Sequence, residues 1–190
     1  MAIQERLYTI DDVWRLAQLP ENELKHFYLI NGELFWDMPP GYRHGRLAGH
    51  IFRFLLNYAE EHDLGEGTVE SAYYPADDRQ TLLAPDVAFL RKQAAPPDTH
   101  EKFVPRMPDL AVEISSPSNS LAELRRKAAV YLANGTELLW LVLPERAGVE
   151  LWRADAEGQP VSEFVAQNGS VSGENVLPGF KLDLQRLFPS

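Results

Sequence analysis

The 190-residue sequence contains no cysteine, which excludes disulfide bonds and thiolate metal sites. It also lacks an apolar run of about 18 residues, the length that a membrane-spanning helix needs. Its first residues, Met-Ala-Ile-Gln-Glu-Arg, do not show the basic and then apolar segments of a secretory signal. We therefore expect a protein that is neither inserted in a membrane nor exported, and we expect it in the cytoplasm.

Basic residues are few. The chain has 18 Lys and Arg against 28 Asp and Glu, for a net charge of −10. This balance argues against a surface that binds nucleic acid over its whole extent, because phosphate binding is largely electrostatic. It leaves room for a local basic groove, and part of the acidic charge can belong to a metal site. A Gly-rich phosphate loop, a Ser-His-Asp order and zinc-type histidine spacing are absent as well.

The length and the ordinary apolar fraction suit a single domain, residues 1–190, with its own core. The hydrophobic pattern predicts an α/β fold: a mixed central sheet flanked by helices, with an N-terminal helix and a β-hairpin. Asn31-Gly32 between two apolar runs indicates a type I′ hairpin turn. A strand, a helix and a second, fully apolar strand over 110–143 favour a parallel crossover.

The expected helices are 10–18, 43–62 and 120–133. The expected strands are 27–36 as a hairpin, then 68–75, 82–90, 110–114, 137–143, an edge strand at 149–153 and a weaker strand at 161–165. A polar loop over 91–106 is expected to be a mobile flap near the strand ends. From residue 177 an apolar tail is expected to pack against the body through four side chains: Leu182, Leu184, Leu187 and Phe188.

Two carboxylates interrupt apolar runs that should be buried strands. Asp86 follows Pro85, and Glu113 lies between Val112 and Ile114. A buried carboxylate costs several kcal/mol unless a cation, a metal or a set of donors compensates it. A divalent metal compensates two carboxylates at once. The alternatives are that Asp86 accepts hydrogen bonds from the turn after Pro85, and that Glu113 forms a buried ion pair.

Asp109 is a second candidate partner for Glu113, because it also follows a proline. The two acids are four residues apart on one strand, which separates them by about 13 Å. Metal–oxygen bonds of about 2.1 Å cannot span that distance. Asp86, on a different strand, is therefore the better partner, and Asp109 is expected to cap the turn after Pro108.

Lys127 lies on the predicted helix 120–133, with Glu123 and Tyr131 one turn away on either side. There are two interpretations. Lys127 either forms a solvated ion pair with Glu123, or it leans over the strand ends, because its face of the helix borders the helix's apolar stripe. In the second case Arg125 and Arg126 would add a local positive patch that binds phosphate.

Two further residues have open interpretations. Ser115, two positions after Glu113 on the same face, either supports a metal-bound water or opens the turn that Pro117 continues. His44, beside Arg43 at the start of the long helix, is either a functional residue or a surface or capping residue.

Together, Pro85-Asp86, Glu113-Ile114-Ser115 and Lys127 resemble the PD-(D/E)XK restriction-endonuclease-like superfamily. More closely, the chain is similar to the Uma-type family of restriction endonucleases, also classed as a domain of unknown function. The similarity extends over nearly the whole chain. The remaining segments that carry it are Leu29–Leu34, Pro39-Pro40, His44, Val87, Pro108–Val112, Ser116-Pro117, Tyr131, Gly135, Trp140 and Leu177–Phe180.

This resemblance implies a restriction-endonuclease-like fold and a metal-dependent endonuclease that hydrolyses nucleic-acid phosphodiester bonds, with DNA as substrate. Asp86, Glu113 and the backbone carbonyl of Ile114 would then hold Mg²⁺, or Mn²⁺ in its place. Lys127 would be the catalytic amine, because Ser115 occupies the superfamily's usual lysine position. Tyr131 would position Lys127, and Ser115 and His44 would support the site. By analogy with duplex-cutting nucleases, and given an apolar tail, a homodimer is expected.

The sequence departs from the family pattern in the hairpin, where Tyr28 and Asn31 replace the usual Glu and Asp. If that Glu helps to hold a metal, its loss weakens the site. The alternative function is therefore a nuclease-fold protein without catalysis that serves as a binding or oligomeric interaction module.

Overall fold

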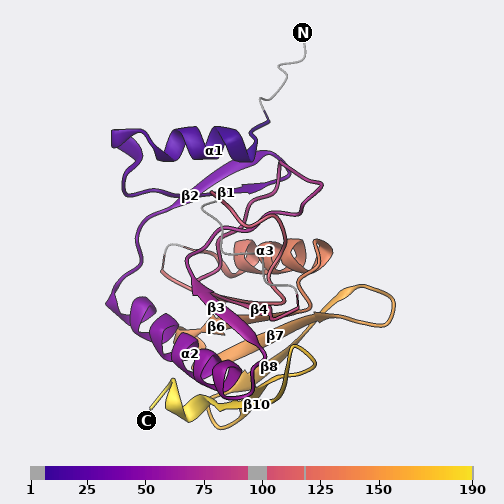
Figure 1. The fold of residues 1–190 in the computed structure, drawn as a ribbon. Coiled ribbons are helices and arrows are strands. Elements are labelled where there is room, and N and C mark those ends of the chain that lie inside the picture. Colours follow the sequence, from indigo (N-terminus) through magenta and orange to yellow (C-terminus); the bar gives the residue numbers. More distant parts are fainter. Residues whose placement is uncertain (1–6, 94–101, 118, 190) are drawn as a thin grey trace.

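The structure is a computed structural model that describes residues 7–93, 102–117 and 119–189. Within these ranges the centre is a six-stranded mixed sheet with the order β3-β4-β5-β6-β7-β8 (Figure 1). β5 and β6 are parallel, and the other neighbours are antiparallel. The strands are β3 (Gly65–Val69), β4 (Val87–Arg91), β5 (Leu110–Ile114), β6 (Leu138–Leu143), β7 (Gly148–Ala154) and β8 (Pro160–Ala166).

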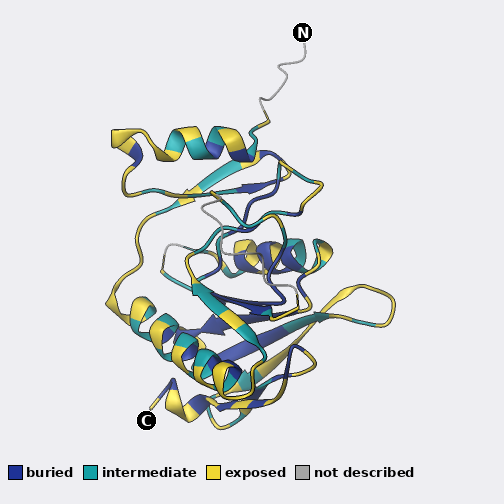
Figure 2. Cartoon of the chain, viewed as in Figure 1, coloured by how far each residue is buried: buried dark blue, intermediate teal, exposed yellow. Residues whose placement is uncertain are grey.

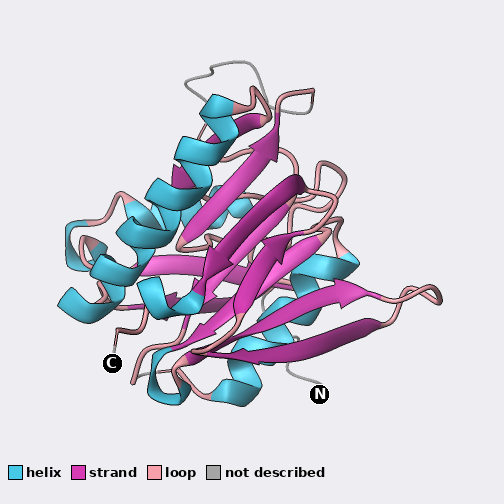
Figure 3. Ribbon diagram, turned by 90° about the horizontal axis from the view of Figure 1, so that it is seen from below, coloured by secondary structure: helices cyan, strands magenta, loops and turns pink. Residues whose placement is uncertain are grey.

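Both faces of this sheet are covered. Helix α2 (Tyr42–Glu61) and the hairpin of β9 (Ser170–Gly173) and β10 (Leu177–Asp183) pack on one face. Helix α3 (Leu121–Ala133) packs on the other, and beyond it lie α1 (Ile10–Ala17) and the hairpin of β1 (His26–Ile30) and β2 (Glu33–Asp37) (Figure 1). Figure 3 shows the strands side by side with the long helix along one face. Three short 3-10 helices complete the described elements: Pro20–Asn22, Pro144–Arg146 and Leu184–Arg186.

Local sequence explains how the elements begin and turn. Thr9 caps α1, and Ser120 caps α3, each in a capping box with the acidic residue three positions later. Asn31 and Gly32 have φ values of 52° and 80°, the left-handed conformation that a type I′ turn requires at both central positions. These caps and the turn fix the direction in which α1, β2 and α3 leave the loops.

Burial is most complete in β5 and β6, in which every residue is buried. Helices cover both faces of these strands, so their sequences are apolar without alternation, apart from Glu113 in β5. In Figure 2 the buried residues follow the central strands, whereas the outer side of α2 is exposed. Glu113 therefore lies in the most completely buried part of the described sheet.

The predicted architecture is confirmed: a mixed α/β sheet with a parallel β5–α3–β6 crossover, an N-terminal helix and a hairpin. The expected edge strand 149–153 is wrong, because β7 pairs on both sides and β8 is the edge. The charged Glu150 made β7 look half-exposed, but Arg125 and Trp152 bind its carboxylate and it is buried.

The C-terminal segment differs in form from the expected tail. It makes the β9–β10 hairpin, and Leu182, Leu184, Leu187 and Phe188 are all buried in the core on the α2 side. The predicted packing is confirmed, but none of the large apolar side chains described in this segment is exposed, so they offer no support for a homodimer. Among the described helices, none is both long enough and apolar enough to cross a bilayer.

Candidate active site

Asp86 and Glu113 lie at the same end of neighbouring strands. Asp86 immediately precedes β4, and Glu113 is the fourth residue of β5. The antiparallel register pairs Val87 with Val112, which brings the two acids side by side. Both line a cavity of about 490 Å³ that is also bordered by the β1–β2 hairpin, the start of α2 and α3.

Asp86 holds the end of β5 and the start of α2 together. Its Oδ2 accepts a hydrogen bond of 2.7 Å from the backbone N–H of Ile114. The same oxygen lies 3.2 Å from His44 Nε2, and that nitrogen lies 3.1 Å from the Ile114 carbonyl oxygen. Since both neighbours are acceptors, Nε2 carries the proton and donates. The Asp86 carboxylate oxygen and the Ile114 carbonyl oxygen therefore both point toward the same atom, Nε2 of His44.

His44 is half-buried, and its Nδ1 has no hydrogen-bond partner among the described residues. Burial is the largest single influence on His44 and acts to lower its pKa, but the hydrogen bond and charge of Asp86, the Ile114 carbonyl and the charge of Glu113 together raise the pKa. The sequence left His44 as either functional or surface; the structure brings it into contact with two of the three expected metal ligands.

Glu113 lies between two donors from α3. Lys127 Nζ lies 2.8 Å from Oε1 and 2.9 Å from Oε2, and the Tyr131 hydroxyl donates to Oε1 at 2.8 Å. All three side chains are buried. Burial acts to lower the pKa of the Lys127 amine, but the Glu113 carboxylate outweighs it and the pKa is raised. The amine is therefore charged, and the pair is the buried ion pair that the sequence offered as an alternative for Glu113.

The other contacts of α3 differ from expectation. Glu123 binds Ser120 in the helix cap, so the solvated Glu123–Lys127 pair is wrong. Tyr131 donates to Glu113 and not to Lys127, whose amine instead lies 4.8 Å from the centre of the Tyr28 ring. Tyr28, the hairpin departure from the family pattern, thus borders the same amine.

The predicted positive patch does not form as expected. The Arg125 guanidinium binds Glu150 on β7, away from the cavity, and Arg126 pairs with Glu33 of the hairpin. Long-range pairing of this kind cannot be inferred from a helix in isolation. Ser115 donates its backbone N–H to Val142 and is absent from the described cavity lining, which includes Ser116 and Pro117; this agrees with its role in opening the turn.

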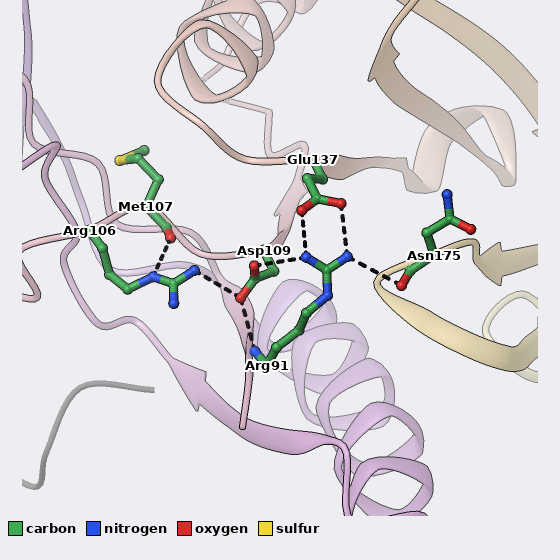
Figure 4. Close-up of polar contacts among 6 residues, drawn as sticks. All are labelled: Arg91, Arg106, Met107, Asp109, Glu137 and Asn175. Carbon is green, nitrogen blue, oxygen red and sulfur yellow. Dashed lines mark hydrogen bonds and ion pairs between the residues drawn. The ribbon is translucent and has the colours of Figure 1, made fainter. Parts of the chain in front are cut away.

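Asp109 belongs to a separate ion-pair network at the far end of β5 (Figure 4). Its carboxylate accepts from the Arg91 backbone N–H at 2.9 Å, the Arg91 guanidinium at 3.2 Å and Arg106 at 3.0 Å. Arg91 also binds Glu137 and the Asn175 carbonyl. The described ends of the 91–106 segment are therefore anchored near strand ends, as expected, where β4 ends and β5 begins and away from Asp86 and Glu113. Residues 94–101 lie outside the described ranges, so the expected mobility of the segment stays a prediction.

The residues around the cavity fit a hard divalent cation. Carboxylate oxygens of Asp86 and Glu113 and the Ile114 carbonyl are the oxygen donors that Mg²⁺ prefers, and Mg²⁺ needs few protein ligands because it keeps several waters. Among the described residues, no group of three or more His, Asp or Glu side chains could hold a metal. A metal held by Asp86 and Glu113 would therefore need the Ile114 carbonyl as a third oxygen donor.

Comparison with known proteins identifies the fold and the family of the chain. A putative nuclease of the DUF820 family from Anabaena variabilis ATCC 29413 has a similar structure, with a TM-score of 0.77 over 95% of this chain and 97% of that chain. At 20% identity this similarity shows the shared fold. No curated protein matches the sequence. The family model Uma2, described as "Putative restriction endonuclease", matches residues 14–185, and the chain thus belongs to this family.

Proposed function

We propose that the chain is an endonuclease that hydrolyses nucleic-acid phosphodiester bonds with Mg²⁺ or Mn²⁺, and that DNA is its substrate. The observation that carries the proposal is the convergence of Asp86 Oδ2 and the Ile114 carbonyl on one point, within 3.2 Å and 3.1 Å of His44 Nε2. Glu113 and the charged Lys127 lie in the same cavity. Family membership supports this assignment, as does the structural neighbour, which is described as a putative nuclease.

Asp86, Glu113 and the Ile114 carbonyl would hold the divalent ion. When bound there, such an ion acidifies water and offsets charge on the phosphate group. The Asp86 hydrogen bond to Ile114 fixes two of these donors relative to each other. His44 keeps both aimed at the cavity, which makes it a positioning residue.

Lys127 would act on the substrate directly. Its buried amine carries a positive charge at the cavity wall and is held by Glu113. A preorganised cation in a site with little water stabilises negative charge that develops on phosphate oxygens. Tyr131 keeps the Glu113 carboxylate in place through its hydroxyl. A homodimer is part of the proposal by analogy alone.

One observation favours a second candidate, a binding or interaction module without catalysis. Both oxygens of Glu113 are engaged by Lys127, and one of them by Tyr131 as well. If these contacts persist in the presence of a divalent ion, Glu113 is a structural ion pair and the cavity only binds.

We expect the purified protein to nick supercoiled plasmid DNA with Mg²⁺ or Mn²⁺ and to stop when EDTA is added, because the carboxylates cannot do the chemistry without the cation. Gel electrophoresis of the plasmid forms over time measures the rate. Nicking that persists in excess EDTA would overturn the metal-dependent mechanism. A folded protein that nicks neither plasmid nor oligonucleotides would favour the binding module.

A further inference from the structure

We propose that the cavity binds unpaired nucleotides, so that the substrate is a single strand, or a segment that is unpaired within supercoiled DNA, and not a base-paired duplex. This inference rests on the proposed function and adds the substrate class. It follows from three features of the described cavity: an aromatic wall, a deficit of free positive charge, and a small volume.

The aromatic wall comes from the β1–β2 hairpin. Tyr28 and Phe35 are cross-strand partners, and their rings stack with centroids 5.1 Å apart and planes 13° from parallel. Both rings are partly exposed and line the cavity, followed by Met38, Pro39 and Pro40 at its border. Aromatic faces at a phosphodiester-binding site bind unpaired bases by stacking, whereas the bases of a duplex already stack on one another.

The charge of the cavity is unsuited to a duplex. Carboxylates outnumber cationic Lys and Arg residues in the lining: the acids are Asp37, Glu70, Asp86, Glu113 and Glu123, and the bases are Arg126 and Lys127. Duplex binding depends on many Lys and Arg contacts to phosphates. A single strand needs fewer, because stacking supplies a large part of its affinity.

The two cations lie beside the aromatic wall. Lys127 Nζ is 4.8 Å from the centre of the Tyr28 ring, and the Arg126 guanidinium is 5.9 Å from that of Phe35. The Arg126–Glu33 pair has side chains 53% and 55% exposed, so it is weak and Arg126 can turn to a phosphate. A base stacked on this wall would therefore have its own phosphate next to a cation.

The cavity is also small. Its volume of about 490 Å³ is that of a pocket for a small molecule, which suits one or two nucleotides. Across it, Asn119 of the β5–α3 loop donates to Asp37 of β2 at 3.2 Å and accepts from Ser116 at 2.6 Å. These contacts join the hairpin to the loop at the wall of the cavity that Asp86 and Glu113 also line.

The test is fluorescence anisotropy with a labelled 12-nucleotide oligo(dT) and a duplex of 12 base pairs, both in EDTA so that no cleavage occurs. We expect oligo(dT) to bind at least about tenfold more tightly than the duplex. Phe35→Leu keeps apolar packing but removes the ring, and should weaken oligo(dT) binding by about 5- to 100-fold. Phe164→Leu, a partly exposed ring on edge strand β8, is the matched control and should leave affinity unchanged.

A second variant at an exposed position keeps the inference testable if Phe35→Leu does not fold. Arg126→Gln changes an exposed side chain and should lower the slope of log K against log salt by about 0.7 for the single strand. Duplex binding as tight as oligo(dT) binding, or unchanged affinity in Phe35→Leu, would overturn the inference. Failure of the proposed function would give a different result. If oligo(dT) binds in a Phe35-dependent way but is not cleaved with any metal, the nuclease proposal is overturned and the binding inference is supported.

Discussion

Replacing Lys127 with methionine is expected to lower the free energy of unfolding by about 3–5 kcal/mol. Lys127 and Glu113 are both buried, and the amine contacts both carboxylate oxygens. Methionine fills a similar volume but leaves the carboxylate without its cation, with only the Tyr131 hydroxyl as a side-chain donor. Urea denaturation followed by circular dichroism measures the loss.

The control is the double variant Glu113→Gln with Lys127→Met. Glutamine still accepts a hydrogen bond from Tyr131 and carries no charge, so the double variant should recover most of the stability lost in the single one. Single and double variants should both lack nuclease activity, which separates catalysis from folding. A Lys127→Met protein as stable as wild type, or a double variant no more stable than the single one, would contradict the buried pair.

Glu113→Gln alone is expected to reduce metal-dependent nicking by about a hundredfold or more, the scale of removing one preorganised charge-stabilising group. Glutamine keeps the shape of the side chain but not the charge that a divalent cation requires. Initial rates of plasmid nicking at saturating Mg²⁺ measure the effect.

Glu150 offers a matched control for that variant. Glu150 is a second buried glutamate and lies on β7. Its carboxylate binds Arg125 and Trp152, and it is not among the described residues that line the cavity. Glu150→Gln should affect stability but leave the nicking rate of the folded protein close to wild type. If Glu113→Gln retains more than about a tenth of the wild-type rate, which corresponds to less than about 1.4 kcal/mol, Glu113 does not have the proposed role.

The architecture could be predicted because the hydrophobic pattern of the sequence matches the burial of its residues in the central strands. The apolar run of β6, and that of β5 apart from Glu113, required cover on both faces of the sheet, and α3 covers one of these faces. Strand β9 was missed because Ser170–Gly173 is short and small, and only Val171 and Gly173 are buried. The position of β7 was misjudged for a different reason: Glu150 looks solvent-facing until Arg125, 25 residues away, is seen to bind it.

The site was predictable in its members but not in its contacts. The carboxylates were visible because they interrupt apolar strands. Which cation would reach them depended on the direction of α3, and sequence could not decide between Glu123 and Glu113 as the partner of Lys127. The contact of His44 with Asp86 joins residues 42 positions apart in the sequence. It forms because the first turn of α2 and the start of β4 lie next to each other in space. Arg126–Glu33 pairs over a still longer separation, and the Arg125–Glu150 pair draws Arg125 away from the cavity, so the predicted patch of these two arginines does not form as expected.

The most direct test of the account is isothermal titration of Mn²⁺ or Mg²⁺ into the wild-type protein, Asp86→Asn and Asp109→Asn. Asparagine at position 86 can still accept the hydrogen bond from Ile114 but has no charge for the cation. Asp109 also follows a proline but lies in the network at the far end of β5, so it is the matched control. We predict a binding heat in the wild type and in Asp109→Asn that is lost in Asp86→Asn. An equal heat in Asp86→Asn, or none in the wild type, would contradict the metal site formed by Asp86, Glu113 and the Ile114 carbonyl.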